Sequence, residues 1–125
     1  MKVSLASLLS KLPRQATAER PDGLFVAEAF AHGTMTLEAF APRSEAQQTS
    51  HFQDRVFIVT RGSATTLTDG ERGEVREGDA LLVEAHDAFT FEATSEDFVA
   101  WIVSWGPEGG EAEAPNPSVF AAIDA

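Results

Sequence analysis

The sequence predicts an all-β fold, a small barrel or sandwich, on three observations. Short β-prone runs follow residue 23, and turn residues separate them roughly every 8–12 residues. No helical pattern lies between these runs. The chain has 125 residues, of which 43 % are hydrophobic, so it can build one core but is too short for two ordinary domains.

A short helix is expected before the strands. Four leucines within residues 5–12 lie at helical spacing and form one apolar stripe. Ser4 is a suitable N-cap residue, and Pro13 ends the pattern. We expect residues 1–23 to form this helix and a linker, with the helix covering one side or edge of the strands.

About eight strands are expected within residues 24–106. They span residues 24–30, 34–41, 55–60, 63–68, 73–76, 80–83, 89–93 and 98–104. Asp69-Gly70 is a tight-turn dipeptide between two of them. Both faces of the last strand are apolar, so one face should line the barrel and the other should meet the helix or a second subunit. Residues 107–125 are expected to form an acidic tail, or an arm laid across the barrel by Phe120.

Composition excludes several classes of function. Nine Lys and Arg against twenty Asp and Glu give a net charge of −11, which disfavours nucleic acids and anionic membranes as partners. Cys is absent, which excludes disulfides, Cys-ligated zinc and thiol nucleophiles. Residues 3–10 contain three serines and precede Lys11, unlike the apolar core of a signal peptide. No run approaches the roughly 20 apolar residues of a membrane span, so we expect a cytoplasmic protein.

Two spaced motifs within residues 24–106 resemble those of the cupin superfamily, in particular a small single-domain cupin with a degenerate metal site. The first motif includes the stretch HFQDRVFIVTRGSA, and the second includes GDALLVEAHDAFTF. Each motif has five positions, which hold Arg43, Thr49, His51, Arg55 and Gly62 in the first motif and Gly78, Glu84, His86, Phe89 and Ala93 in the second. Gly62 and Gly78 keep the motifs' structural glycines. The resemblance implies a jelly-roll barrel with a short N-terminal helix.

The resemblance also implies that the usual metal site is lost. In the family, four motif positions bind a divalent metal, and here they hold Thr49, His51, Arg55 and Phe89. Only His51 keeps a metal-binding side chain. Arg55 is always charged and only donates, so it would repel a cation. We therefore expect no metal cofactor; if a metal binds, His51 is its ligand.

Side chains alternate between the two faces of a strand, which predicts what lines the barrel. The expected substrate-binding residues are Thr49, Gln53, Phe57, Phe89, Phe91 and Trp101. Arg55 shares this face and could clamp a substrate anion. The alternatives are an ion pair with an inward carboxylate, or a bulge that turns Arg55 to solvent. Glu28 or Glu38 could supply that carboxylate, although a solvated, outward position is favoured for both.

His51 is the best candidate general acid or base, because imidazole titrates near neutrality; the alternative is an imidazole that only makes a structural hydrogen bond. His32 and His86 are expected to be solvated loop residues, although His86 could rim the pocket. Asp54 is expected to face outward without a role.

Three functions remain open for a barrel that binds a small molecule, and whether it is an enzyme is undecided. The first is a metal-independent isomerase, epimerase or lyase acting on a small anionic or carbonyl compound, in which His51 moves the proton and Arg55 holds negative charge. The second is a non-catalytic binding or sensing barrel. The third is a metal-dependent cupin with unusual ligands, namely His51 with Gln48, Gln53, His86 or an inward Glu. Small cupins are commonly dimers, so a homodimer is expected.

Overall fold

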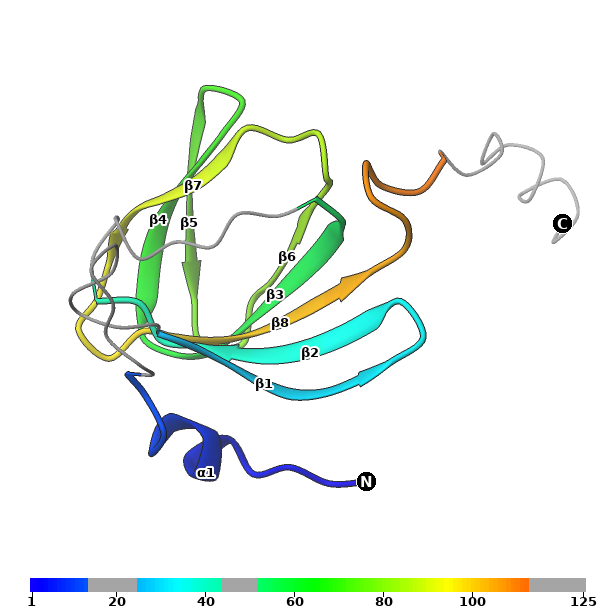
Figure 1. Cartoon of the computed structure of the whole chain (residues 1–125). Helices are drawn as coiled ribbons and strands as arrows, with labels where there is room; N and C mark the ends of the chain where they lie inside the picture. The colour runs from blue at the N-terminus through cyan, green and yellow to red at the C-terminus, as the bar shows by residue number, and fades with distance from the viewer. Residues whose placement is uncertain (14–24, 44–51, 113–125) are drawn as a thin grey trace, which may run out of the picture.

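The computed structural model describes residues 1–13, 25–43 and 52–112, which form one helix and eight strands in two antiparallel sheets. The elements are α1 (Leu5–Leu9), β1 (Val26–His32), β2 (Met35–Phe40), β3 (Asp54–Arg61), β4 (Ser63–Thr68), β5 (Glu71–Arg76), β6 (Ala80–Val83), β7 (Phe89–Thr94) and β8 (Val99–Trp105). The strand order is β1-β2-β8-β3-β6 in the larger sheet and β5-β4-β7 in the smaller. The two sheets face each other and enclose the barrel (Figure 1). The predicted all-β jelly-roll fold is confirmed.

The core lies between the two sheets because every second side chain of each strand points inward. On β3, Arg55, Phe57 and Val59 are buried, whereas Ile58 between them is 39 % exposed. The same alternation on the other strands completes one cluster of Phe40, Phe57, Val59, Ala64, Val75, Val83, Phe91, Phe98, Ala100 and Ile102. The predicted inward face of β3 is therefore correct.

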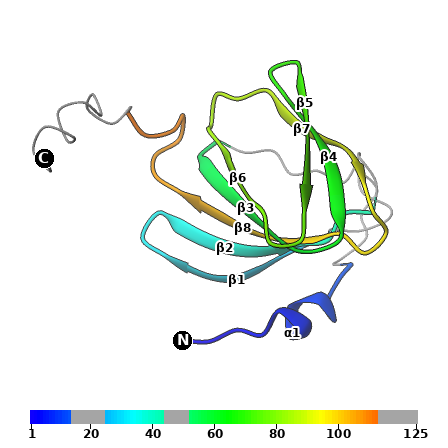
Figure 2. The same cartoon turned by 180° about the vertical axis from the view of Figure 1, so that it is seen from behind.

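Helix α1 covers the outer face of the larger sheet at its β1–β2 side (Figures 1 and 2). The Ser4 hydroxyl caps it by accepting a hydrogen bond from the Ser7 N–H (3.5 Å). Leu8 is buried against Ala27 and Ala39, which face outward from β1 and β2. The helix ends at Leu9, earlier than the leucine stripe predicted, although Leu12 still packs against this outer cluster.

The two apolar faces of β8 serve different neighbours. Ala100 and Ile102 belong to the core between the sheets, whereas Trp101 packs outside, in the cluster beneath α1. Trp101 lies between Ala39 of β2 and Ile58 of β3 on that outer face. The prediction that Trp101 lines the barrel interior is therefore wrong, and we remove it from the candidate site.

The predicted tight turn between β4 and β5 is present. Asp69 (φ 49°) and Gly70 (φ 87°) both adopt positive φ angles, as a type I′ hairpin turn requires. The Asp69 carboxylate also accepts a hydrogen bond from the Ala88 N–H (3.0 Å), which ties the turn to the segment before β7.

Within the described residues, no helix is long and apolar enough to cross a membrane.

Candidate functional site

A row of polar side chains crosses the inner face of the larger sheet. Thr36 of β2, Ser104 of β8 and Arg55 of β3 are cross-strand neighbours, so their side chains share one face. Arg55 and Ser104 are buried, at 6 % and 3 % exposure. The Ser104 hydroxyl makes no hydrogen bond within the described part of the chain. A buried hydroxyl without a protein partner is unusual and is a natural contact for a bound molecule.

Glu38 also faces the interior, one inward position along β2 from Thr36. It lies opposite Ile102, which is fully buried in the core. Burial raises the pKa of the Glu38 carboxyl; Arg55 opposes this shift, and Glu28 adds to it. The expectation of an outward, solvated Glu38 is therefore wrong, because its strand neighbours place it inside the barrel.

Burial has the opposite effect on the pKa of Arg55 from its effect on the pKa of Glu38. It lowers the pKa of the guanidinium, and the nearby Glu38 carboxylate raises it. An arginine guanidinium nonetheless stays protonated in proteins, so Arg55 remains charged at neutral pH. A permanent cation and a carboxyl group with a raised pKa thus face the same interior, and the charge of each shifts the pKa of the other.

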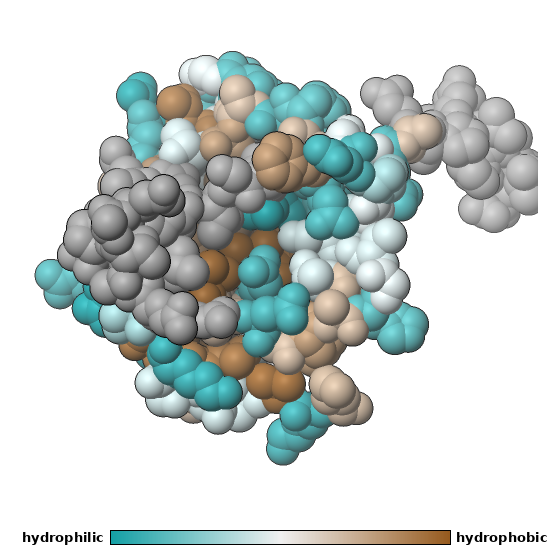
Figure 3. Space-filling view, viewed as in Figure 1, coloured by the Kyte–Doolittle hydropathy of each residue, from teal (hydrophilic) through white to brown (hydrophobic). Residues whose placement is uncertain are grey.

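An aromatic wall flanks this charged pair. The Phe57 and Phe91 rings meet edge to face (centroids 5.1 Å apart), as do those of Phe89 and Phe91 (5.0 Å). The Arg55 guanidinium carbon lies 5.8 Å from the centre of the Phe57 ring, within the range of a cation–π contact. Figure 3 shows apolar side chains at the bottom of a hollow in the middle of the molecule, with hydrophilic side chains in front of them. A mostly apolar lining with a few polar groups is typical of small-molecule sites.

The remaining predicted site residues treated next are Thr49, His51 and Gln53. Thr49 and His51 lie outside the described residues, so their roles stay predictions. The Gln53 side-chain amide donates hydrogen bonds to the carbonyls of Thr34 (3.1 Å) and Gly106 (2.8 Å). Gln53 therefore ties together the segments that follow β1 and β8, and we assign it a structural role.

Asp54 is a residue whose role the sequence did not reveal. It faces outward as predicted, but its carboxylate accepts hydrogen bonds from the backbone N–H groups of Glu111 and Ala85 (2.9 Å each). These bonds lower the pKa of Asp54. Asp54 thus fastens two loops to the start of β3, directly beside Arg55. The only sign of this role in the sequence is that an acidic residue stands at the start of a strand.

His86 lies outside the barrel in an exposed turn. Its Nε2 atom is 3.1 Å from a Glu84 carboxylate oxygen and 3.7 Å from one of Asp87. Such exposed acidic groups are common without a bound ion. His86 is therefore not a neighbour of Arg55, contrary to the unusual ligand set considered above. His32, at the end of β1, is exposed as expected.

The family of the chain follows from its sequence. A family model described as a cupin domain matches residues 36–105, which is more than half of the chain. The chain belongs to the cupin family. No curated protein matches it in a sequence search.

Solved structures agree with the cupin fold. The protein NMB1881 from Neisseria meningitidis is 15 % identical with a TM-score of 0.62, over 85 % of this chain and 100 % of that one. A cupin-2 domain protein from Shewanella frigidimarina is 12 % identical with a TM-score of 0.62, over 83 % and 94 %. KdgF from a Halomonas species is 17 % identical with a TM-score of 0.55, over 66 % and 80 %. At these identities the likeness concerns the fold alone.

Two of the four positions that hold a metal in cupins are described by the structure, and neither fits a metal. Arg55 is a buried cation that only donates hydrogen bonds, and Phe89 has no ligand atom. Arg55 would repel a divalent ion at this place in the barrel. The Arg55 guanidinium would instead attract an anion.

Proposed function

We propose that this cupin is a metal-independent acid/base enzyme acting on a small anionic or carbonyl compound bound inside the barrel. The observation that carries the proposal is that the buried Arg55 and the partly buried Glu38 share the inner face of the larger sheet and shift each other's pKa. A binding barrel needs only the cation, whereas acid/base chemistry also needs a group that exchanges a proton. Glu38 supplies that group from the described part of the chain.

Arg55 binds the negative charge of the substrate. A guanidinium presents several N–H donors in one plane and suits a carboxylate, phosphate or enolate. Its partly apolar surroundings strengthen this attraction relative to water. Ser104, its cross-strand neighbour, can donate its hydroxyl proton to the same oxygen atoms.

Glu38 moves the proton. A carboxyl group with a raised pKa exchanges protons closer to neutral pH than an ordinary glutamate does. In the proposed step, the Glu38 carboxylate removes the proton on the carbon next to a carbonyl, and Arg55 stabilises the resulting enolate. Return of the proton to the other face, or to the neighbouring carbon, yields an epimer or an isomer without any co-reactant. His51 remains a second predicted proton carrier.

The phenylalanine wall limits access of water to this step. Phe57, Phe89 and Phe91 offer no competing polar group, so bound substrate replaces solvent around the charged pair. The volume behind them is filled by the core cluster, which favours a small substrate.

The test is hydrogen–deuterium exchange followed by NMR, with pyruvate, 2-oxobutanoate, glyceraldehyde 3-phosphate and glucuronate in D₂O. We expect at least one of these compounds to exchange its carbon-bound proton much faster with the protein than in buffer. Glu38→Gln should abolish the exchange while largely sparing binding, and Arg55→Lys should weaken both. Arg76→Lys, on the exposed strand β5, is the control.

The outcomes separate the candidate functions. A compound that raises the melting temperature through Arg55 but never exchanges protons would indicate the non-catalytic binding barrel. Exchange that persists unchanged in Glu38→Gln but disappears in His51→Ala would transfer the proton step to His51. Absence of both binding and exchange for every anionic compound tested would overturn the proposal.

A further inference from the structure

The outer face of the larger sheet is apolar across four of its strands. Because directly paired residues share a face, the register defines two rows that cross the sheet. One row holds Leu37 of β2, Val103 of β8, Val56 of β3 and Leu82 of β6. The other row holds Ala39, Trp101, Ile58 and Ala80 on the same four strands. Neither row contains a polar or charged side chain, although the solvated face of an antiparallel sheet is normally polar.

Helix α1 covers only one side of this face. Ala39 and Trp101 belong to the cluster beneath the helix, which lies at the β1–β2 side of the sheet (Figure 1). Of the described residues, none in that cluster comes from β3 or β6. Leu82 is 55 % exposed and Ile58 is 39 % exposed. We define the outer apolar face as the six residues of the two rows that lie outside this cluster: Leu37, Val56, Ile58, Ala80, Leu82 and Val103.

The smaller sheet has an outer face of the opposite character. Strand β5 contributes Arg72, Glu74 and Arg76 to it, and these residues pair with the β4 residues that alternate with its buried ones. Arg72 also forms an ion pair with Glu92 of β7 (2.7 Å). The two sheets enclose the same core, so the difference concerns their outer faces alone. A charged face suits water, whereas the outer apolar face suits a protein partner.

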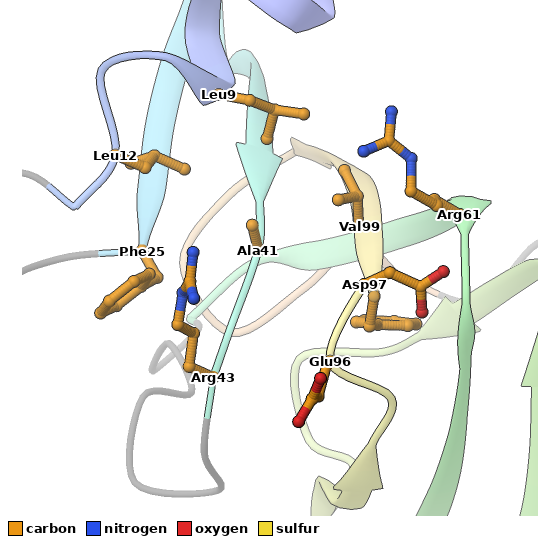
Figure 4. Close-up of a pocket in the computed structure, with 10 residues that line it drawn as sticks. Leu9, Leu12, Phe25, Ala41, Arg43, Arg61, Glu96, Asp97 and Val99 are labelled. Atoms are coloured by element: carbon orange, nitrogen blue, oxygen red, sulfur yellow. The ribbon is translucent and has the colours of Figure 1, made fainter.

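Charged side chains mark the two ends of the outer apolar face. In Figure 4, a close-up beside the end of α1, Arg61 at the end of β3 points to the side of the sheet on which α1 lies, as does Val99 of β8. At the other end, Asp54 begins β3 opposite Trp105. An apolar centre with a polar rim is the usual anatomy of a protein–protein interface.

The size of this face fits a stable contact. Four strands about 4.8 Å apart, with β8 crossing the face from Trp101 to Trp105, give an apolar area of about 300 Å². A rim about one side chain wide raises the contact to about 800 Å², which is the area that each partner contributes to a standard interface.

The charge of the chain favours a second copy as the partner. Its net charge of −11 makes two copies repel each other wherever acidic surfaces meet. The outer apolar face brings no charged side chain into such a contact, and it offers no carboxylate to attract a basic protein. A second copy presents a face of the same size, twist and apolar character. We propose that two copies of this chain pack their outer apolar faces together and form a homodimer.

In this dimer the two larger sheets stack face to face, about 10 Å apart. Leu82 and Ile58 lose their exposed surface, and the partly buried Val56 and Val103 become fully covered. Arg55 and Glu38 face the opposite side of the same sheet, so the candidate site stays inside each barrel. The proposal therefore does not depend on the function proposed above.

The test is sedimentation equilibrium of the full chain over a wide range of concentrations. We expect reversible association to twice the monomer mass of 13.4 kDa. Leu82→Lys and Ile58→Lys should each raise the dissociation constant of the dimer tenfold or more, because a buried unpaired charge is costly. Thr65→Lys makes the same charge change on the outer face of the smaller sheet and should leave the dissociation constant unchanged. Circular dichroism verifies that each variant is folded.

Added salt distinguishes apolar from electrostatic association. Screening weakens the repulsion between two acidic copies, so raising NaCl from about 20 to about 300 mM should lower the dissociation constant. Association that weakens with salt would show that opposite charges hold the copies together, and would overturn the proposal.

The position of the contact is tested by ¹⁵N NMR. Dilution through the dissociation constant should shift the amides of β3 and β6 more than those of β4 and β5. A monomer at every concentration would overturn the proposal and leave the face to another protein or to parts of the chain outside the described ranges. Full association in both lysine variants would overturn it as well, because the contact would then lie elsewhere.

Discussion

Glu38 of β2 and Arg55 of β3 face the same interior, with β8 between their strands, and each shifts the pKa of the other toward its charged form. Burial acts against both charges and prevails for both, so the pKa of Glu38 is raised and that of Arg55 is lowered. The pair therefore combines a permanent cation with a carboxyl group that takes up a proton more readily than an exposed one. This relationship is the basis of the proposed chemistry.

The raised pKa of Glu38 predicts how stability depends on pH. The folded protein binds this proton more tightly than the unfolded chain, whose glutamate pKa is about 4.3. The free energy of unfolding should therefore fall as pH rises from about 4 through the raised pKa. Glu38→Gln removes this loss, so urea unfolding should show the variant gaining stability relative to wild type as pH increases. A trend of opposite sign would contradict the raised pKa of Glu38.

Arg55 and Phe89, at two of the four positions that bind the metal in cupins, predict a low metal content for the protein. We expect plasma mass spectrometry to find far less than one ion per chain, both as isolated and after incubation with Mn, Fe, Ni, Cu or Zn and desalting. Arg55 opposes cation binding at its place in the barrel. Stoichiometric metal that disappears in His51→Ala would instead return the protein to the metal-dependent cupins.

Gly62, between β3 and β4, should tolerate no side chain. Its φ is 78°, and an added Cβ would lie 2.9 Å from the Phe98 Cα and would also collide with Ser95. Gly62→Ala should destabilise the fold by about 2–4 kcal/mol, from backbone strain plus overpacking. Gly70→Ala is the matched control, because φ is 87° there but nothing lies within 4 Å of the added Cβ. In urea unfolding, Gly70→Ala should lower the free energy of unfolding by only about 1 kcal/mol. If both substitutions lower it equally, overpacking at Gly62 is refuted.

Asp54 should stabilise the loops beside the site in a pH-dependent way. Its pKa is lowered by two backbone hydrogen bonds, so its contribution is present above the usual value of about 3.9 and is lost as pH falls. Asp54→Asn should cost about 1 kcal/mol at pH 7, a modest value because the carboxylate is partly solvated. The difference from wild type should shrink on acidification. If Asp54→Asn lowers the free energy of unfolding equally at pH 7 and pH 3, the shape of the Asp54 side chain rather than its charge explains the cost.

Much of the inner face could be predicted from local patterns. Because side chains alternate strictly along a strand, a buried Phe57 places Arg55 and Val59 on its face whatever the rest of the fold does. The Asp69-Gly70 turn is equally local, since positive φ angles favour these residues. The N-cap at Ser4 follows from its own side chain.

The failed predictions for Trp101 and Glu38 both depend on distant neighbours. Both faces of β8 are apolar, so alternation alone could not say that α1 would cover Trp101 while Ile102 entered the core. Glu38 looked solvated because it is a charged residue within an otherwise apolar strand. Its burial results from pairing with β8, whose residues lie more than sixty positions away in the chain.

The sequence by itself therefore determined the all-β cupin barrel and the strand boundaries to within a few residues. For Arg55 it left both an inward position and a bulge open. The tertiary structure decided that the Glu38 carboxyl shares the interior with Arg55 and which face of β8 is internal. The physical reason is the range of the interactions. Alternation and turn geometry act between adjacent residues, whereas burial and electrostatic pairing act between strands that only the folded sheet brings together.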